Sequence, residues 1–145
     1  MDRFLYEKSI SYQGYLIIPF VRVTVSDKKI YSYMLLSQWG HKGKFHKSEN
    51  PADLYCSQLE KIIEIAQDHL DHYSDIVPKE DYFHCRYTYQ NDLIVIYQEA
   101  EKYFYDHYKP YSLNNIAAPK LFLSQQDCIN WVKAGLDRSG TVTEP

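Results

Sequence analysis

The first 39 residues are rich in apolar and aromatic side chains, and two short polar points among them are candidates for tight turns. These points are Gln13-Gly14 and residues 26–29. The segments on either side of them are rich in the β-branched and aromatic residues that favour strands. The pattern predicts three antiparallel strands, joined by two tight turns, across residues 3–39.

The second of these strands carries valines at alternate positions, Val21, Val23 and Val25, with polar residues between them. Alternate residues of a strand point to the same face, so we expect all three valines to face the core. Pro19 has no N–H to donate to a neighbouring strand. We therefore expect Pro19 at a sheet edge or at a bulge.

A helical pattern follows in residues 50–75. Asn50 is a favourable N-cap and Pro51 suits the first helical position. Apolar residues then recur at steps of three and four, at Leu59, Ile62, Ile63, Ala66, Leu70 and Tyr73. This spacing places them on one face of a helix, so the sequence predicts an amphipathic helix that begins at Asn50-Pro51.

The second half of the chain continues with shorter elements. Residues 81–98 have the pattern of a second hairpin, with its turn at Asn91-Asp92. Residues 99–108 have the spacing of a helix. Ser124, followed three residues later by an aspartate, predicts the capped start of a final helix.

The order of these elements favours one fold class. A run of strands, then a helix, a hairpin and further helices differs from the regular alternation of parallel α/β folds. We predict an α+β fold: a mostly antiparallel sheet, made of the N-terminal three-stranded meander and the later hairpin, with about three helices packed on one face. One core serves a chain of this size, so residues 1–138 should form a single domain. Residues 139–145 have little to bury and should be a disordered tail.

Composition and charge narrow the class of protein. Apolar residues make up 45% and charged residues 24% of the chain, as in ordinary globular proteins. The formal net charge of −3 disfavours nucleic acid as the partner, because binding to phosphates normally requires a basic face. The longest apolar run, residues 15–21, is too short to cross a bilayer, so we expect no membrane association.

Cysteine and tyrosine add two expectations. Three widely spaced cysteines, Cys56, Cys85 and Cys128, provide neither a disulfide framework nor a zinc motif, and they favour a reducing, cytoplasmic setting. Fifteen tyrosines offer large rings with a polar tip, which suit both interfaces and half-buried sheet faces. A tyrosine-rich binding surface, with the possibility of self-association, and a plain tyrosine-rich sheet are the two interpretations.

The basic loop, which we define as residues 40–47, is the strongest candidate site. Its candidate binding side chains are His41, Lys42, Lys44, His46 and Lys47. Ammonium groups, backbone N–H groups beside the glycines and the start of the next helix could all bind an anion, although the spacing is not that of a P-loop. The loop predicts a site for a small anion or a partner, and a solvated loop is the alternative.

A strand of the second hairpin offers another candidate surface. If residues 82–89 form a strand, His84 and Arg86 lie on its polar face, where flanking tyrosines could help to bind an anionic group. Cys85 then points to the opposite face, so His84 cannot activate it as a nucleophile. We include His84 and Arg86 as binding candidates and interpret Cys85 as a core residue.

Two histidines near the end of the first long helix, His69 and His72, lie one turn apart. Two imidazoles at that separation can bind one metal ion. The HExxH spacing of zinc hydrolases is missing, however, and histidines are favoured near a helix C-terminus in any case. We therefore predict no metal and no cofactor.

No acid, base and nucleophile form a known catalytic motif, so we predict no catalytic residues. We interpret the chain as a small non-catalytic binding or regulatory module. It would act through the basic loop and a tyrosine-rich surface on a protein partner, a second copy of itself or a small anionic ligand. The alternative is a phosphate-handling hydrolase or nuclease, in which a residue of the basic loop meets one of the helix histidines or Arg86 across a cleft.

Overall fold

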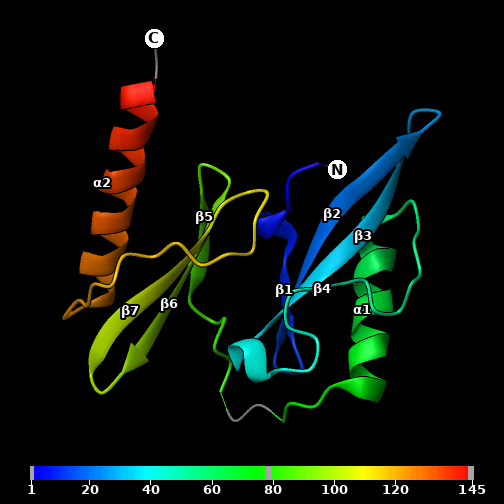
Figure 1. The fold of residues 1–145 in the computed structure, drawn as a ribbon, viewed down its shortest axis with the longest axis horizontal. Coiled ribbons are helices and arrows are strands. Elements are labelled where there is room, and N and C mark those ends of the chain that lie inside the picture. Colours follow the sequence, from blue (N-terminus) through cyan, green and yellow to red (C-terminus); the bar gives the residue numbers. More distant parts are fainter. Residues whose placement is uncertain (1, 78–79, 144–145) are drawn as a thin grey trace.

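The protein is built in four layers, in the order helix, sheet, sheet, helix (Figure 1). The structure, a computed structural model, describes residues 2–77 and 80–143. A four-stranded and a three-stranded antiparallel sheet face each other. Each sheet carries one α-helix on its outer face, so the two helices lie on opposite sides of the molecule.

The four-stranded sheet contains β1 (Ile10–Tyr12), β2 (Tyr15–Val25), β3 (Lys28–Ser37) and β4 (Ser48–Glu49), in that order. The three-stranded sheet contains β5 (Arg86–Tyr89), β6 (Asp92–Glu99) and β7 (Lys102–Tyr108), also in chain order. The helices are α1 (Leu59–Tyr73) and α2 (Gln125–Thr143), and two short 3₁₀ turns are η1 (Tyr6–Lys8) and η2 (Gly40–Lys42).

The predicted α+β class, with antiparallel strands, is confirmed. The strands form two sheets, and residues 2–77 and 80–143 contain two α-helices where about three were expected. The helices pack on different sheets, because the first sheet already buries its second face against the other sheet. Residues 139–143 continue α2, and residues 144–145 of the predicted tail lie outside the described residues. The division into a domain and a tail stays a prediction.

All four tight hairpins turn through two residues with positive φ. These pairs are Gln13-Gly14, Ser26-Asp27, Gln90-Asn91 and Ala100-Glu101. Two-residue turns of this kind match the right-handed twist of the strands they join. The first two predicted turns are confirmed, and the third lies one residue before the predicted Asn91-Asp92.

The predicted helix over residues 99–108 is wrong, because these residues form a turn and β7. The Glu-Ala-Glu start favours helix, but only by roughly a few tenths of a kcal/mol per residue. The aromatic residues that follow pair with β6 in a continuous register from Leu93↔Tyr108 to Glu99↔Lys102. Pairing with a buried strand outweighs that local propensity.

The strand β2 is buried on both faces along its first half, which explains its unbroken apolar run. Leu16, Ile18 and Phe20 pack between the two sheets. Tyr15 and Ile17, on the opposite face, pack under α1. A strand covered on both faces needs apolar residues at every position rather than at alternate ones.

Beyond Val21 the hairpin of β2 and β3 extends past the core (Figure 1). A bulge follows Val21, and Val23 and Val25 are 48% and 55% exposed. The prediction that the valines face the core is therefore right for Val21 and wrong for the other two. Pro19 lies where β1 has already ended, and its carbonyl accepts a hydrogen bond from the N–H of Leu5 on that side. The missing N–H of Pro19 thus faces a sheet edge, as expected.

The helix α1 begins at Leu59, eight residues after Pro51, the predicted first helical residue. Asn50 does not cap a helix: it adopts a positive φ of 42°. Its buried side chain donates to the carbonyl of Leu54 and accepts from the Leu54 N–H. Asparagine closes such local turns readily, which competes with capping.

The apolar stripe of α1 is buried as predicted through Ile62, Ala66 and Leu70. The final helix begins at Gln125, and the Ser124 hydroxyl accepts a hydrogen bond from the Asp127 N–H over 3.1 Å, which confirms the predicted cap. Within the described residues neither helix combines the length and the apolar character that crossing a bilayer requires.

Candidate anion-binding site

The basic loop is held firmly by the residues around it. The carboxylate of Asp75, just after α1, accepts the backbone N–H of Lys44 over 2.9 Å and the hydroxyl of Tyr15 over 2.6 Å. The same hydroxyl accepts the N–H of Phe45 over 3.1 Å. Burial would raise the pKa of Asp75, but these hydrogen bonds hold it below its ordinary value. The loop backbone is therefore tied to β2 and to the end of α1.

Close packing adds to this restraint. A Cβ placed on Gly43 would lie 1.9 Å from the Ser37 Oγ atom, so no side chain fits at that position. The Phe45 ring contacts the rings of Tyr15 and His69, with centroids 6.0 and 5.0 Å apart. Phe45 anchors the loop on the core, and the Lys44 ammonium lies 5.2 Å from the centre of its ring.

A hydrogen bond holds the His46 ring in one orientation. Its Nδ1 atom accepts a hydrogen bond from the backbone N–H of Ser37 over 3.1 Å, so the neutral ring carries its proton on Nε2. Burial lowers the pKa of His46, and the nearby charges of Lys47 and His41 lower it further. His46 is thus a neutral imidazole whose Nε2–H remains to donate.

Three of the five candidate side chains of the basic loop line a cavity of about 520 Å³ between the loop and the three-stranded sheet, which we call the inter-sheet cavity. They are His41, His46 and Lys47. In Figure 1 the loop, with η2 in cyan, lies beside the junction of the two sheets. The loop thus presents an ammonium group and two imidazoles to one cavity.

The opposite wall of the inter-sheet cavity is a buried polar network around Asp106. This carboxylate accepts hydrogen bonds from the Tyr82 hydroxyl (2.8 Å), the Asn115 amide (2.8 Å) and, more weakly, the Tyr108 hydroxyl (3.4 Å). Asp106 is only 9% exposed. Burial raises its pKa, and the three hydrogen bonds oppose that rise.

The two walls differ in chemistry. The loop wall supplies donors, namely the Lys47 ammonium and the imidazole N–H groups. On the network wall the tyrosine hydrogens already point at Asp106, so the lone pairs of Tyr82 and Tyr108 remain as acceptors. The cavity therefore suits an anionic group on one side and a hydrogen-bond donor on the other.

Two further loop candidates, Lys42 and Lys44, do not line the inter-sheet cavity. His84 lines another cavity, beside Cys85 and Tyr97. Arg86 is used inside the fold: its guanidinium donates to the Phe83 carbonyl and, through two nitrogens, to the carbonyl and hydroxyl of Ser9. The structure therefore brings His41, His46 and Lys47 together and separates the other four candidates from them.

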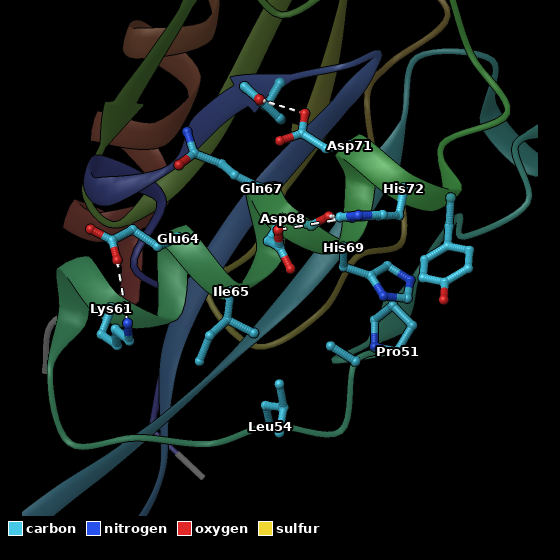
Figure 2. Close-up of a pocket in the computed structure, with 13 residues that line it drawn as sticks. Pro51, Leu54, Lys61, Glu64, Ile65, Gln67, Asp68, His69, Asp71 and His72 are labelled. Carbon is cyan, nitrogen blue, oxygen red and sulfur yellow. Dashed lines mark hydrogen bonds and ion pairs between the residues drawn. The ribbon is translucent and has the colours of Figure 1, made fainter.

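The two helix histidines line a different and larger cavity beside α1 (Figure 2). His72 donates from Nδ1 to the Asp68 carbonyl over 2.9 Å, and Asp71 accepts the Tyr12 hydroxyl. Burial lowers the pKa of His69, whose ring packs against the rings of Phe45 and Tyr73. His41 and His46 line the inter-sheet cavity, so these two residues do not share a cavity with His69 and His72 as the hydrolase alternative would require, whereas the nearby charge of Lys44 helps to lower the pKa of His69. No group of three or more metal-ligating residues forms within residues 2–77 and 80–143 either.

Tyrosine is used mostly inside the protein. Five tyrosines are buried in the core: Tyr6, Tyr15, Tyr33, Tyr105 and Tyr108. Several hydroxyls donate to aspartates, in the pairs Tyr12-Asp71, Tyr15-Asp75, Tyr82-Asp106 and Tyr89-Asp137. Part of the tyrosine excess therefore has a structural explanation, because a tyrosine such as Tyr15 fills the core with its ring while its hydroxyl reaches a carboxylate at the boundary.

Sequence reasoning missed the network wall. Asp106 lies in β7, which the sequence predicted as a helix, and Tyr82 and Asn115 lie in connecting segments. One signal was present: a single acid within the aromatic run of residues 103–108, where a strand between two packed layers would bury it. A buried carboxylate requires hydrogen-bond donors, and of the donors here only Tyr108 belongs to the same strand.

Comparisons of the chain with protein-family models, with curated proteins and with solved structures find no match. The function is therefore argued from the geometry of the site alone.

Proposed function

We propose that the protein is a non-catalytic binding module that takes an anionic group into the inter-sheet cavity. One observation carries this proposal: His41, His46 and Lys47 of one restrained loop line a single cavity whose other wall offers acceptor oxygens. A loop that is already ordered loses little conformational entropy on binding, which favours affinity.

The ligand class follows from the two walls. A phosphate or carboxylate would accept hydrogen bonds from the ammonium of Lys47 and from the His46 Nε2–H. A hydroxyl or amino group on the same ligand would donate to the tyrosine oxygens opposite. We therefore propose a small phosphorylated or carboxylated compound that also carries hydroxyl or amino donors.

A binding role is supported over catalysis by the state of the polar groups. Asp106 is saturated by three donors, and His46 is held by Ser37. A general base needs a free lone pair directed at the substrate, whereas both of these groups serve to hold the walls in place. The hydrolase alternative has no comparable geometric support.

The predicted protein partner, or a second copy of the chain, enters this proposal as another source of the anionic group. A phosphorylated or acidic side chain presents the same chemistry as a small molecule. Light scattering at rising protein concentration tests the second copy, since self-association must raise the mean mass.

The proposal is tested by thermal melting with a matched ligand pair, glycerol 3-phosphate and propyl phosphate. The two share the phosphate, and only the first carries hydroxyl donors. At about ten times its dissociation constant, a ligand that binds only the folded state adds about 1.4 kcal/mol, which is a rise of roughly 3–6 °C. We expect both compounds to raise the melting temperature, glycerol 3-phosphate more strongly. Choline as a cationic control should have no effect, and equal shifts with all three compounds would rule the proposal out.

A further inference from the structure

A second cavity, of about 780 Å³, lies on the outer side of the three-stranded sheet, between β7 and α2. We call it the β7–α2 groove. Trp131 and Ile116, which line it, are 39% and 50% exposed. Alternate residues of β7 line the two cavities, Tyr105 and His107 this one and Asp106 and Tyr108 the inter-sheet cavity. The cavities are therefore separate sites on opposite faces of the sheet.

One end of this groove is apolar and aromatic. The rings of Tyr105 and Trp131 meet there, with centroids 6.1 Å apart. The buried side chains of Val132 and Leu136 continue the apolar lining along α2. The Lys120 ammonium lies 5.4 Å from the centre of the Trp131 ring, but Lys120 does not line the groove.

The middle of the groove is kept open by a glycine within α2. Glycine weakens a helix interior, so an isolated glycine there usually has a packing or functional reason. A Cβ on Gly135 would meet nothing closer than the Arg138 guanidinium, at 3.9 Å. The position therefore tolerates a side chain, and the gap it leaves is part of the groove.

The other end is cationic. The carboxylate of Asp92, whose side chain is 5% exposed, accepts from His107 Nε2 over 2.7 Å and pairs with the Lys109 ammonium over 3.0 Å. One acid thus holds two basic groups in position. Arg138 adds an exposed guanidinium that pairs with no carboxylate in the part of the chain that the structure describes. This end is basic in a chain whose net charge is −3.

The spacing between the two ends sets the length of a ligand. Lys109 lies four residues beyond Tyr105 on the strand side, which is about 13 Å. Arg138 lies seven residues beyond Trp131 on the helix side, which is about 10 Å. In Figure 1, β7 and α2 run in the same direction, so Lys109 and Arg138 lie toward the same end of the groove.

We propose that the β7–α2 groove binds an amphipathic carboxylate, a molecule with an apolar body roughly 10 Å long and one acid group at its end. The apolar body would lie over Trp131, Tyr105 and the gap at Gly135. The acid would pair with Lys109 and Arg138, and a guanidinium suits a carboxylate because it donates through two parallel N–H groups. The groove is a second site, independent of the function proposed above.

The test uses decanoate and the fluorescence of Trp131. The chain has two tryptophans, so Trp39→Phe leaves Trp131 as the only reporter. We expect saturable binding of decanoate, with a blue shift of the emission as water leaves the ring. Decanol, which lacks the charge, should bind at least tenfold more weakly, and decyltrimethylammonium should not bind.

Variants of the groove complete the test. Gly135→Leu fills the gap and improves helix propensity, so it should abolish decanoate binding without lowering the melting temperature. Lys109→Ser combined with Arg138→Ser should weaken decanoate about tenfold and leave decanol unchanged, which keeps the proposal testable if Gly135→Leu misfolds. Lys47→Ser, in the other cavity, should have no effect. The absence of saturable binding, equal affinity for decanoate and decanol, or undiminished binding to folded Gly135→Leu would each overturn the proposal.

Discussion

The Nδ1 atom of His46 accepts the backbone N–H of Ser37 over 3.1 Å, and this contact joins the basic loop to the end of β3. It fixes the neutral tautomer, because the nitrogen that accepts cannot carry the proton. It also gives the loop a dependence on pH. Protonation of Nδ1 would remove the acceptor and release the loop from Ser37.

We expect NMR to find the His46 proton on Nε2 near neutral pH, and to find a pKa below the ordinary histidine value of about 6.5. Burial is the main cause of this lowering, with Lys47 and His41 adding to it. A histidine with a depressed pKa adds stability above its ordinary pKa, and that stability is lost as the pH falls through the folded value. Nitrogen shifts recorded from pH 8 to pH 4 test this. A proton on Nδ1 at neutral pH, or a pKa above that of an exposed histidine, would contradict the assignment.

Asp106 should respond to pH in the opposite sense. Its pKa is raised by burial, so its favourable contribution is present below the ordinary value of about 3.9 and is lost as the pH rises through the folded pKa. Asp106→Asn removes the charge. Its amide oxygen can still accept from the Asn115 amide, and its NH2 group can donate to the Tyr82 oxygen once that hydroxyl turns. The free energy of unfolding of the variant, relative to that of wild type, should therefore rise as the pH increases from acidic to neutral. Urea unfolding at several pH values measures this. Asp106→Leu leaves the same donors without an acceptor and should lower the free energy of unfolding by about 2–3 kcal/mol. If Asp106→Asn is already more stable than wild type at acidic pH, this account of the network is refuted.

Removal of one hydroxyl should loosen the basic loop. Tyr15→Phe deletes the donor to Asp75 and the acceptor of the Phe45 N–H, and two lost hydrogen bonds at a buried ring should cost about 2 kcal/mol. Tyr12→Phe is the matched control, because Tyr12 donates to Asp71 over the same 2.6 Å at an exposed position, where water replaces the lost partner, and it should cost clearly less than Tyr15→Phe.

The Tyr15 effect also has a predicted pH dependence. The pKa of Asp75 is held low by its hydrogen bonds, so its contribution is present above about pH 3.9 and is lost as the pH falls through the lower folded value. The difference in the free energy of unfolding between wild type and Tyr15→Phe, measured with urea, should accordingly become smaller at acidic pH. Equal costs for the two tyrosine variants at neutral pH would mean that Asp75 does not hold the loop.

Gly43→Ala and Gly135→Ala should change stability in opposite directions. The first places a Cβ 1.9 Å from Ser37 Oγ and should destabilise the protein by roughly 1–3 kcal/mol. The second adds a Cβ in open space on a helix and should stabilise by about 1 kcal/mol. Thermal melting of both variants measures this, and a neutral Gly43→Ala would show that the loop can move away from Ser37.

The sequence predicted those elements that short-range chemistry determines. The turns at Gln13-Gly14 and Ser26-Asp27 join segments of strong strand propensity, and Ser124 caps its helix locally. Other elements depend on distant partners. The turn at Ala100-Glu101 uses residues with no preference for turns, and β7 forms because β6 is beside it.

The residues of the candidate site also fall into two groups, those that the sequence could predict and those that it could not. The cluster of basic residues in the loop is visible in the sequence, but nothing in the sequence separates Lys47, which lines the cavity, from Lys42, which does not. Arg86 looked like a surface donor, because its partner Ser9 is 77 residues away. The wall formed by Asp106 required the packing of two sheets, which no local pattern encodes.

The central claim is that Lys47 and its neighbours bind an anion in the inter-sheet cavity, and one matched pair of variants tests it most directly. Lys47→Ser and Lys42→Ser remove the same charge from the same loop, but only Lys47 lines the cavity. We would titrate glycerol 3-phosphate calorimetrically into each variant at about 0.15 M salt, where distant charges are screened. The account predicts that Lys47→Ser weakens binding about tenfold, or about 1.4 kcal/mol, and that Lys42→Ser changes it less than about twofold. Equal weakening by both variants, or binding that survives Lys47→Ser unchanged, would contradict it.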